Sequence, residues 1–505
     1  MDNQYNKSKK YFDNGLELLK VKSYSQAETA FRKANELTPN RMSVLLNLST
    51  CLIEQDQWDE AFKFISLALE LIPDDEDALL NLGIYQAHTS LTLEALASFN
   101  KVLSKNAKNE KALINKGNIL QDIFQHHEAL DCFNIALEIN PTSVEALIGR
   151  GNVKNFFKLY DSAIKDFGAA INLDPENPKA NTNKGMALIR LGDFKNGWKF
   201  YEHRWGIHDI KRYGWQANIP TWNGEYGGDK KTILVLSEQG FGDNIQLARY
   251  LPLLTEKYGF NVQFYSPKAL CTLMQTLHPK IKVVSNLIGL PPNIEYQIPI
   301  MSLPYLFGTD LSNIPANTPY FFLPPDFSLK WRERISESAN TKSWNPTLQI
   351  GICWRGSGKY AGQANARRDL NSQSLELLVS KLKDQNVQLH SLQADLDLQD
   401  IQIVKDLGLY VHQNDLSDFL QTAYLINELD IVISIDTAVG HLSGALNKLT
   451  YLLLPDPPDF MSLIDREDTP WYPSTLLIRQ DKPGDWTSVI TKLMQHLNRQ
   501  KKTTA

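Results

Sequence analysis

An alanine returns every 34 residues through the first two-fifths of this 505-residue chain, and this spacing constrains the fold more than any other feature. The five alanines are Ala27, Ala61, Ala95, Ala129 and Ala163, and Gly197 takes the sixth place. A strict period of this length predicts a stack of similar supersecondary units, because one unit of that size cannot bury its apolar face alone. We therefore expect a solenoid in this part of the chain.

Four further positions keep the same step and indicate that the unit is a pair of helices. They are an aromatic at Phe31, Phe99, Phe133 and Phe167, a second alanine at Ala34, Ala68, Ala136 and Ala170, a proline at Pro39, Pro73, Pro141 and Pro175, and a small residue at Gly15, Ser49, Gly83, Gly117, Gly151 and Gly185. The pattern resembles the tetratricopeptide repeat, in which alanine allows close helix packing and proline ends the second helix because it has no N–H. We expect about six repeats over residues 8–205, the last one degenerate, with a concave face for a peptide or partner protein.

Composition and charge exclude several classes of protein. The formal net charge is −5, and no cluster of Lys and Arg with interleaved aromatics is present, which disfavours nucleic acid as a partner. The four cysteines stand far apart without a C-x-x-C motif, so we expect reduced thiols and neither a zinc site nor a disulfide framework. The polar N-terminus and the absence of a run of 18 apolar residues disfavour secretion and membrane spanning, and favour a cytoplasmic protein.

The sixth repeat departs from the pattern and marks the end of the array. Trp198, Tyr201 and Trp205 replace small residues there, which predicts a cap that packs onto something other than a further repeat. Residues 206–230 are rich in Gly, Trp, Tyr and Pro without any period, so we interpret them as an ordered connector between two folded units.

After Lys231, short apolar runs alternate with helix-like segments, which predicts parallel βαβ units. The first set of strands is expected at 233–237, 262–266 and 281–284, and the second at 348–354, 387–392, 429–435, 449–454 and 476–478. A proline-rich stretch at roughly 311–346 separates the two sets. We therefore expect an N-terminal Rossmann-like half at 231–325 and a C-terminal one at 347–495, facing each other across a cleft.

Three loops that follow predicted strands carry the residues of interest. In open parallel sheets the ligand lies at the carboxyl ends of the strands, so chemistry is sought there. The three loops are residues 238–243, 355–368 and 436–441.

The residues around these loops resemble a known family. ILVLSEQGFGDNIQLARYLPLL, GICWRGSGKY with a later RRDL, and ISIDTAVGHLSGALN are similar to family-9 glycosyltransferases, the ADP-heptose:lipopolysaccharide heptosyltransferase group, and to bacterial proteins that fuse this domain to tetratricopeptide repeats. The resemblance covers about residues 231–495. It implies a GT-B fold, an acceptor side in the N-terminal half, and a nucleotide-sugar donor held mainly by the C-terminal half. It also implies inversion at the anomeric carbon without a metal. No cofactor is expected, because the nucleotide-sugar is a co-substrate.

Asp243 is the candidate catalytic base. It stands at the start of a predicted helix, where the similar family places an aspartate, and Gly240 and Gly242 would let the backbone approach a bound sugar. The alternative is that Asp243 only caps the helix. The two roles conflict electrostatically, because a base working near neutrality needs a raised pKa whereas a helix N-terminus lowers the pKa of a carboxylate.

Asp436, Thr437 and His441 form the candidate site for the diphosphate of the donor. A helix N-terminus presents free N–H groups to a phosphate, and a hydroxyl and an imidazole add further donors. The alternative is that Asp436 and Thr437 cap the helix while His441 packs beneath it. The chain also departs from the family, because Ala438 follows the D-T pair where glycine is usual.

The second loop supplies four candidate donor-binding cations, Arg355, Lys359, Arg367 and Arg368. Basic side chains at a strand end can clamp a dianionic leaving group in place of a metal, although a solvated surface loop is the alternative. The D-x-D at Asp395 and Asp397 matches a motif of metal-dependent transferases, but so short a match arises by chance and the fold interpretation opposes it.

A column of asparagines marks one face of the repeats. Its members are Asn47, Asn81, Asn115 and Asn183, and Asp13 and Gly149 interrupt it. Such amides can pair with the backbone of an extended peptide, but at this position they also bond between neighbouring helices.

The sequence thus predicts a glycosyltransferase that moves a sugar from a nucleotide diphosphate donor to an acceptor hydroxyl. The repeats would recruit a protein partner, and the acceptor would be that protein, a glycan or a lipid. The alternative is an inactive transferase-like scaffold whose repeats mediate protein–protein interaction.

Overall fold

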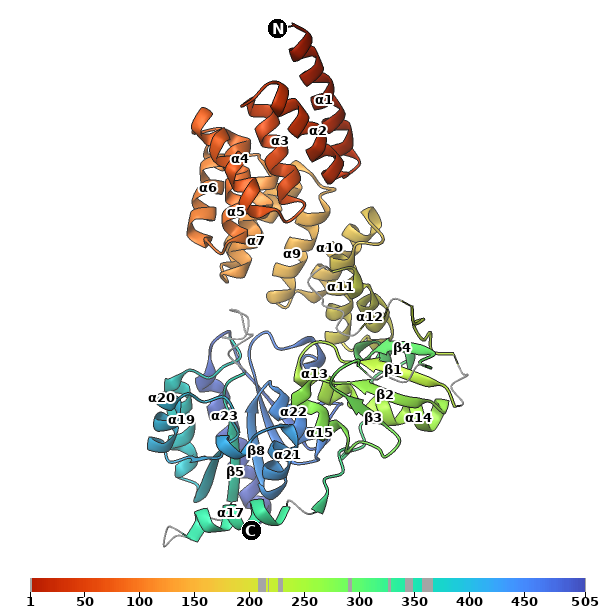
Figure 1. Ribbon diagram of the computed structural model, residues 1–505. Coiled ribbons are helices and arrows are strands. Elements are labelled where there is room, and N and C mark those ends of the chain that lie inside the picture. The colour runs from red at the N-terminus through yellow and green to blue at the C-terminus, as the bar shows by residue number, and fades with distance from the viewer. Residues whose placement is uncertain are drawn as a thin grey trace. The chain divides into compact units, whose positions relative to one another are not determined.

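The computed structural model describes residues 2–207, 215–216, 218–225, 230–288, 293–325, 328–340, 348–356 and 367–504. The chain divides into two compact units, residues 1–180 and 181–505. The N-terminal unit contains helices and no described strand, and the C-terminal unit contains two parallel sheets (Figure 1).

The N-terminal unit is a run of antiparallel helix pairs with the period of the sequence. Its helices are α1 (Asp2–Lys20), α2 (Tyr24–Leu37), α3 (Met42–Ile53), α4 (Trp58–Leu71), α5 (Glu76–His88), α6 (Thr92–Lys105), α7 (Glu110–Asp122), α8 (His126–Ile139), α9 (Val144–Phe156) and α10 (Tyr160–Leu173). Ala107 stands where the other repeats have proline, yet α6 ends at the position equivalent to the ends of α4 and α8. Proline therefore reinforces the helix end without being required for it.

The recurrent glycine and phenylalanine form the same contact in four of the repeats. A Cβ added to Gly15 would lie 2.6 Å from Phe31 Cε1, and one added to Gly83 would lie 2.6 Å from Phe99 Cε1. Both phenylalanines are fully buried. The small residue is therefore required because the ring from the second helix fills the space beside it.

The C-terminal unit begins with the helices of the degenerate sixth repeat. These are α11 (Pro178–Arg190), α12 (Phe194–Tyr201) and the short 3₁₀ helix η1 (Glu202–Gly206). The rings of Phe194 and Trp471 stack with centroids 5.9 Å apart, and the ring of Tyr201 lies 5.5 Å from that of Phe460. These aromatics pack onto the α/β core, and they belong to the same compact unit as that core.

The first sheet has four parallel strands in the order β3-β2-β1-β4. The strands are β1 (Thr232–Leu236), β2 (Asn261–Tyr265), β3 (Lys282–Val284) and β4 (Tyr296–Pro299). Its helices are α13 (Phe241–Leu247), η2 (Ala248–Tyr250), α14 (Leu251–Tyr258), η3 (Lys268–Leu270), α15 (Cys271–Met274), η4 (Ile300–Ser302) and α16 (Leu303–Leu306). In the described part of the connector, Thr221 forms a parallel bridge with Gln297 of β4, so the connector lengthens this edge of the sheet.

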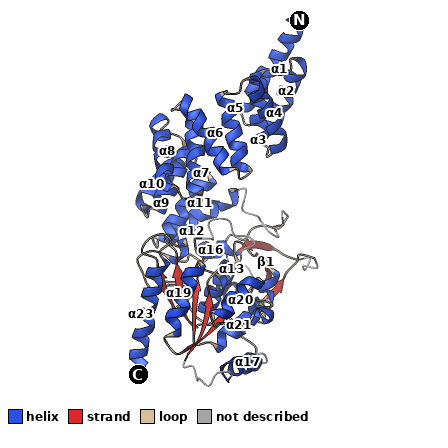
Figure 2. Cartoon of the chain, turned by 90° about the vertical axis from the view of Figure 1, so that its left-hand side faces the viewer, coloured by secondary structure: helices blue, strands red, loops and turns tan. Residues whose placement is uncertain are grey.

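The second sheet has six parallel strands in the order β10-β9-β8-β5-β6-β7. The strands are β5 (Leu348–Cys353), β6 (Val387–Ser391), β7 (Tyr410–Val411), β8 (Ile431–Ile435), β9 (Leu449–Leu454) and β10 (Thr475–Arg479). The helices are α17 (Ser328–Asn340), α19 (Ser372–Lys383), α20 (Leu398–Asp406), η6 (Gln413–Asp415), α21 (Phe419–Glu428), α22 (Ala438–Ala445), η7 (Phe460–Ser462) and α23 (Trp486–Thr504). Figure 2 shows these strands flanked by helices, which explains why every residue of β8 is buried.

The eight strands predicted from sequence are all present, and the α/β class is confirmed. The order places β5 beside β8, so the carboxyl ends of the first and fourth strands of this half are neighbours.

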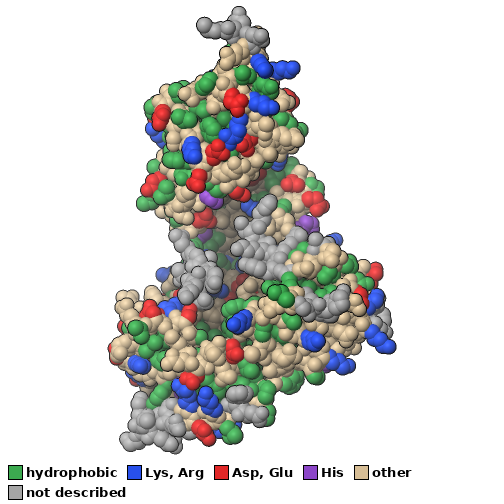
Figure 3. Space-filling view, viewed as in Figure 1, with side chains coloured by type: hydrophobic (Ala, Val, Ile, Leu, Met, Phe, Trp, Pro, Cys, Tyr) green, Lys and Arg blue, Asp and Glu red, His purple; other side chains and the backbone are tan. Residues whose placement is uncertain are grey.

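None of the described helices is both long and apolar enough to cross a membrane. Acidic and basic side chains are interspersed over the face shown in Figure 3, in agreement with the small net charge.

Candidate functional site

A cavity of about 770 Å³ opens where the carboxyl ends of strands from both sheets meet. Its wall contains all of residues 237–243 after β1, residues 436–438 and His441 after β8, and Gly356 and Arg368 after β5. Further wall residues follow β2 and β9. All three loops selected from the sequence therefore contribute to one cavity.

Asp243 lies in the first turn of α13 and caps it. Its Oδ2 accepts a hydrogen bond from the N–H of Gly240 at 2.9 Å, and Gly240 is the N-cap residue of the helix. Removal from water in the cavity wall raises the pKa of Asp243 to about 7, and the charge of Asp459 adds to this rise. His441 and the Gly240 N–H oppose the rise but do not cancel it. Asp243 is thus a helix cap and a carboxylate with a pKa near neutrality at the same time.

Asp436 and His441 form a pair at the start of α22. His441 Nε2 lies 3.4 Å from Asp436 Oδ1, and His441 Nδ1 lies 3.2 Å from the hydroxyl of Tyr472. Burial of Asp436 acts to raise its pKa, but the hydrogen bond and charge of His441, together with the charge of Arg368, lower it overall. Asp436 and Tyr472 therefore fix the two ring nitrogens of His441, and His441 forms part of the cavity wall.

Thr437 is the N-cap residue of α22, but its side chain makes no capping bond. Its hydroxyl lies 3.0 Å from Ser434 Oγ and 3.6 Å from Cys353 Sγ. Gly440, the glycine displaced from the family position, is required for packing, because a Cβ there would lie 2.6 Å from Leu452 Cδ1. The side chain of Thr437 therefore leaves the N–H groups at the start of the helix uncapped.

The arginines of the second loop lie in different surroundings and have different contacts. Arg368 lines the cavity, and its charge lowers the pKa of Asp436. Arg367 donates from Nη2 to the carbonyl oxygen of Asp456 at 2.7 Å, so it supports the loop that follows β9. Lys359 falls outside the described residues.

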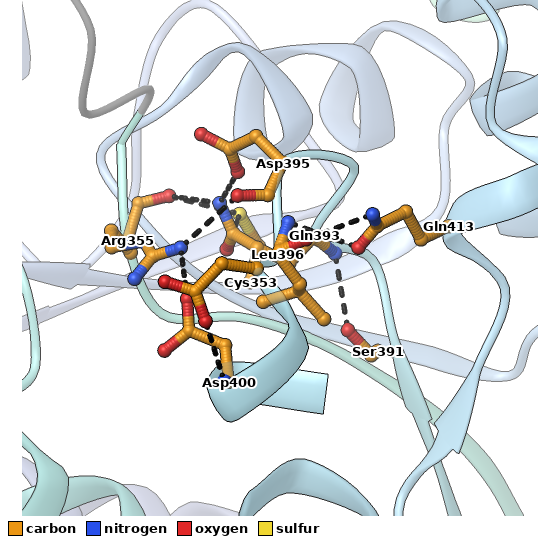
Figure 4. A network of polar contacts seen from close by, with 9 residues as sticks. Cys353, Arg355, Ser391, Gln393, Asp395, Leu396, Asp400 and Gln413 are labelled. Atoms are coloured by element: carbon orange, nitrogen blue, oxygen red, sulfur yellow. Dashed lines mark hydrogen bonds and ion pairs between the residues drawn. The ribbon is translucent and has the colours of Figure 1, made fainter. Parts of the chain in front are cut away.

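Arg355 belongs to a polar network beside the strand ends rather than to the described cavity wall (Figure 4). Its Nη2 lies 2.8 Å from Asp400 Oδ2, and the amide of Gln393 donates to the Arg355 carbonyl at 2.9 Å and to Asp395 Oδ1 at 2.8 Å. Asp397 caps α20 by accepting from the N–H of Asp400 at 2.8 Å. Both aspartates of the D-x-D motif therefore have structural partners.

Two residues of the cavity wall were given no role in the sequence analysis. Glu238 is buried in the cavity wall, and both its oxygens accept from Arg204, at 2.6 Å from Nε and 2.9 Å from Nη2. Asp459 follows β9, lines the cavity and accepts from the N–H of Met461 at 2.9 Å. Glu238 opens the first of the three loops, in EQGFGD, and Asp459 stands in PDPPDF, after a predicted strand.

The asparagines of the repeats make helix contacts. The amide of Asn81 donates to Ser49 Oγ at 2.9 Å and to Thr50 Oγ1 at 3.2 Å, which joins two repeats. Asn47 and Asn115 each donate to a carbonyl oxygen of their own helix. Of these three, only Asn81 bonds between neighbouring helices as the structural alternative predicts, whereas Asn47 and Asn115 bond within their own helix. Asn183 also has a partner.

Comparisons with known proteins support the assignment of the N-terminal helices as tetratricopeptide repeats. Residues 18–82 and 110–143 match family models described as tetratricopeptide repeat. The curated protein FlbA of Caulobacter vibrioides is 23% identical over 337 residues, which cover 61% of this chain and 53% of FlbA. The chain thus spans about half the length of that relative.

Solved structures with similar helices are repeat proteins or assemblies. The Cut9–Hcn1 complex of the APC/C is 16% identical over 41% of this chain and 41% of that one, with a TM-score of 0.38. TTC0263, a tetratricopeptide protein of Thermus thermophilus, is 14% identical over 36% of this chain and 99% of its own, with a TM-score of 0.33. The family matches establish tetratricopeptide repeats in the N-terminal unit, and such repeats indicate protein–protein interaction.

Proposed function

We propose that the chain is a glycosyltransferase that moves a sugar from a nucleotide diphosphate donor to an acceptor hydroxyl, with the two sheets arranged as in the GT-B class. The observation that carries the proposal is the position of Asp243 in one cavity with Asp436, His441 and Arg368. A carboxylate with a pKa near neutrality faces a helix N-terminus, an imidazole and a guanidinium, which are the groups that proton removal and diphosphate departure require.

In this proposal the acceptor oxygen attacks the anomeric carbon while Asp243 removes the proton of the acceptor hydroxyl. The bond between the anomeric carbon and the diphosphate oxygen breaks, and its electron pair leaves with the diphosphate. Attack opposite the leaving group inverts the configuration. The uncapped N–H groups of α22, with His441 and Arg368, stabilise the charge of the departing diphosphate.

The pKa of Asp243 favours the base assignment over a purely capping role. The bond from Gly240 and the helix dipole act to lower this pKa, as expected for a cap. Removal from water and the charge of Asp459 outweigh them. A group with a pKa of about 7 is ionised for a substantial fraction of the time at neutral pH and is basic enough to accept a proton.

The repeats supply the second part of the proposed function. Tetratricopeptide arrays present a concave surface to proteins, so a protein partner is proposed for the N-terminal unit, either as the acceptor or as an adaptor for a glycan or lipid acceptor.

Thermal unfolding of the full chain with ADP, GDP and UDP and their sugar conjugates tests the donor site. A matching nucleotide at about 100 times its Kd stabilises a folded protein by about 2.7 kcal/mol. We expect selective stabilisation by one nucleotide class, lost in Asp436→Ala and in His441→Ala.

Asp243→Asn separates binding from chemistry. This variant should be stabilised by the same nucleotide but should release no diphosphate from the matching nucleotide-sugar. If no nucleotide stabilises the wild-type chain, the transferase proposal fails and the scaffold alternative, supported by the repeats alone, replaces it.

A further inference from the structure

Gln246 presents a buried polar group for which the protein supplies no adequate partner. Its side chain is 1% exposed and lies in the cavity wall. The amide nitrogen contacts only the sulfur of Met461, at 3.7 Å, and sulfur is a weak acceptor. Among the described residues, no donor lies within hydrogen-bonding distance of Gln246 Oε1.

Buried polar groups in folded proteins are nearly always paired, and leaving one unpaired costs about 1–3 kcal/mol. The neighbouring Asn244 also has a buried oxygen without a partner among the described residues, but its nitrogen is fully engaged by the fold. Its nitrogen donates to the carbonyl oxygens of Glu238 and Gly240, at 2.9 and 2.8 Å, and it does not line the cavity. Gln246 lacks such bonds and faces the cavity, so the missing partner is expected on the ligand side.

The position of Gln246 in α13 places it beside the proposed base. Residues three apart in a helix lie on one face, so Asp243 and Gln246 both face the cavity from α13. The segment η7 approaches from the other half of the unit, and its Met461 contacts Gln246 while Asp459 lines the same cavity. The cavity wall that holds the base and the pair of Asp436 and His441 therefore also contains an amide and a carboxylate.

The carboxylate of Asp459 is held in one orientation by the backbone and is accessible from the cavity. Its Oδ1 accepts from the N–H of Met461, which fixes the carboxylate, and its side chain is exposed to the cavity. The carbonyl oxygen of the adjacent Pro458 accepts from Arg190 Nη2 at 3.1 Å, so the backbone beside Asp459 is also held. Trp471 is a buried residue of the same cavity wall, and its Nε1 donates to the carbonyl oxygen of Met461 at 3.2 Å, which holds this segment in place.

We propose that Gln246 and Asp459 form a subsite that binds the hydroxyl groups of the transferred sugar, an inference that rests on the glycosyltransferase function proposed above. A carboxylate accepts hydrogen bonds from hydroxyl groups, and an amide both donates and accepts, so together they match a polyhydroxylated ring. The subsite recognises the sugar and not the nucleotide, so Gln246 and Asp459 determine donor specificity.

Isothermal titration of the full chain with UDP, GDP and ADP, and with UDP-glucose, UDP-N-acetylglucosamine, GDP-mannose and ADP-glucose, tests the subsite. For the nucleotide that binds, Gln246→Leu and Asp459→Asn should each weaken binding of its sugar conjugate by about tenfold or more, because each removes a hydrogen bond to the sugar. Affinity for the bare diphosphate should change less than about twofold.

Glu467→Gln is the matched control for Asp459→Asn. Glu467 is an exposed acid in the same connection between β9 and β10 and does not line the cavity, so its variant should bind both ligands as the wild type does. Gln246→Leu carries its own control, because removing an unsatisfied buried amide should leave the melting temperature of the unliganded chain unchanged or raised. A lowered melting temperature for Gln246→Leu would assign Gln246 to the fold.

Two results overturn the inference, and they are distinguishable. If a diphosphate binds and both variants weaken the diphosphate and its sugar conjugate equally, or weaken neither, the transferase proposal survives and the sugar subsite does not. If no nucleotide or conjugate binds the wild-type chain, both proposals fail together.

Discussion

Gly242 lies directly against His441. A Cβ added to Gly242 would come 2.8 Å from His441 Cδ2 and 3.6 Å from the Cα of Ala438. Gly242 belongs to α13, after the first strand of one sheet, and His441 to α22, after a central strand of the other. Figure 1 shows these two helices side by side, and the absent side chain sets how closely they approach.

Gly242→Ala should therefore impair the site more than the fold. The added methyl group must displace the imidazole, which would disturb the pair with Asp436, whereas alanine is the better residue within a helix by roughly 1 kcal/mol. We expect turnover to fall at least about tenfold with a change in unfolding free energy below about 1 kcal/mol.

The control for this variant is Gly356→Ala, whose Cβ would meet nothing nearer than Arg368 Nη2 at 3.6 Å. Diphosphate release and thermal unfolding of both variants make the comparison. Equal turnover in the two variants would show that the close approach of Gly242 to His441 has no catalytic consequence.

Asp243→Asn should abolish turnover and also change the pH dependence of stability. The pKa of Asp243 is about 7 in the folded chain and lower, near 4, in the unfolded chain. The folded state therefore binds this proton more tightly, and the resulting stabilisation is present below about pH 4 and is lost as the pH rises to about 7. Asparagine does not titrate, so the variant should gain stability relative to the wild type across this window, by roughly 2–4 kcal/mol at pH 8.

Two measurements check this prediction. The kcat/KM of the wild type should rise with pH through about 7 as the base ionises, and turnover of Asp243→Asn should be at least about a hundredfold lower at every pH. Thermal unfolding of both chains between about pH 5 and pH 8 gives the stability difference. A difference that stays constant with pH would mean that the pKa of Asp243 is not raised by folding.

Much of the fold was predictable because its contacts are encoded locally. The pairs Gly15 with Phe31 and Gly83 with Phe99 lie within single repeats, so one period in the sequence reports every copy of the contact. The two strands that sequence reasoning missed, β4 and β7, are short edge strands of four and two residues, and β4 ends in Pro299. So short a segment carries no measurable alternation, and its pairing depends on a neighbour that is distant in sequence.

The residues of the candidate site were predictable only where they lie in loops directly after strands. Asp243, Asp436 and His441 were found because carboxyl ends of parallel strands converge, which holds for any such sheet. Gln246 was missed because its role depends on Met461, 215 residues away, and Arg204 because it lies in the degenerate repeat and pairs with Glu238 across 34 residues. Tertiary contacts of this kind leave no periodic or motif signal.

Arg204→Ala should destabilise the C-terminal unit strongly. The side chain of Arg204 is fully buried and makes two hydrogen bonds to Glu238. It also donates to Ser302 Oγ at 2.9 Å, to Glu202 Oε1 at 2.7 Å and to the carbonyl oxygen of Tyr201 at 3.3 Å. Burial alone would lower the pKa of Arg204, but the charge of Glu238 outweighs it. Removing one member of a buried pair leaves an uncompensated charge and costs about 3–5 kcal/mol.

Chemical denaturation of the full chain measures this loss, and a double-mutant cycle assigns it. Arg204→Met combined with Glu238→Gln should recover a large part of the stability, because no buried charge remains. Arg466→Ala is the control, since Arg466 pairs with the exposed Asp468 and its loss should cost less than about 1 kcal/mol. Comparable losses in Arg204→Ala and Arg466→Ala would contradict a dominant role for the buried pair.

Gly149 interrupts the asparagine column for a steric reason, and this gives a prediction for the N-terminal unit. A Cβ on Gly149 would lie 2.4 Å from both Cε1 and Cζ of Phe133, a fully buried ring that also lies against Gly117. Gly149→Asn, which restores the column, should therefore lower the unfolding free energy by about 1–3 kcal/mol despite the better helix propensity of asparagine.

Asn115→Ala, at the equivalent position of the preceding repeat, is the control. It removes one exposed bond within a helix and should lower the unfolding free energy by less than about 0.5 kcal/mol. Thermal unfolding of the two variants compares these costs directly. A stable Gly149→Asn chain would mean that the Phe133 ring can leave its place between the two glycines, and that the column is broken by something other than packing.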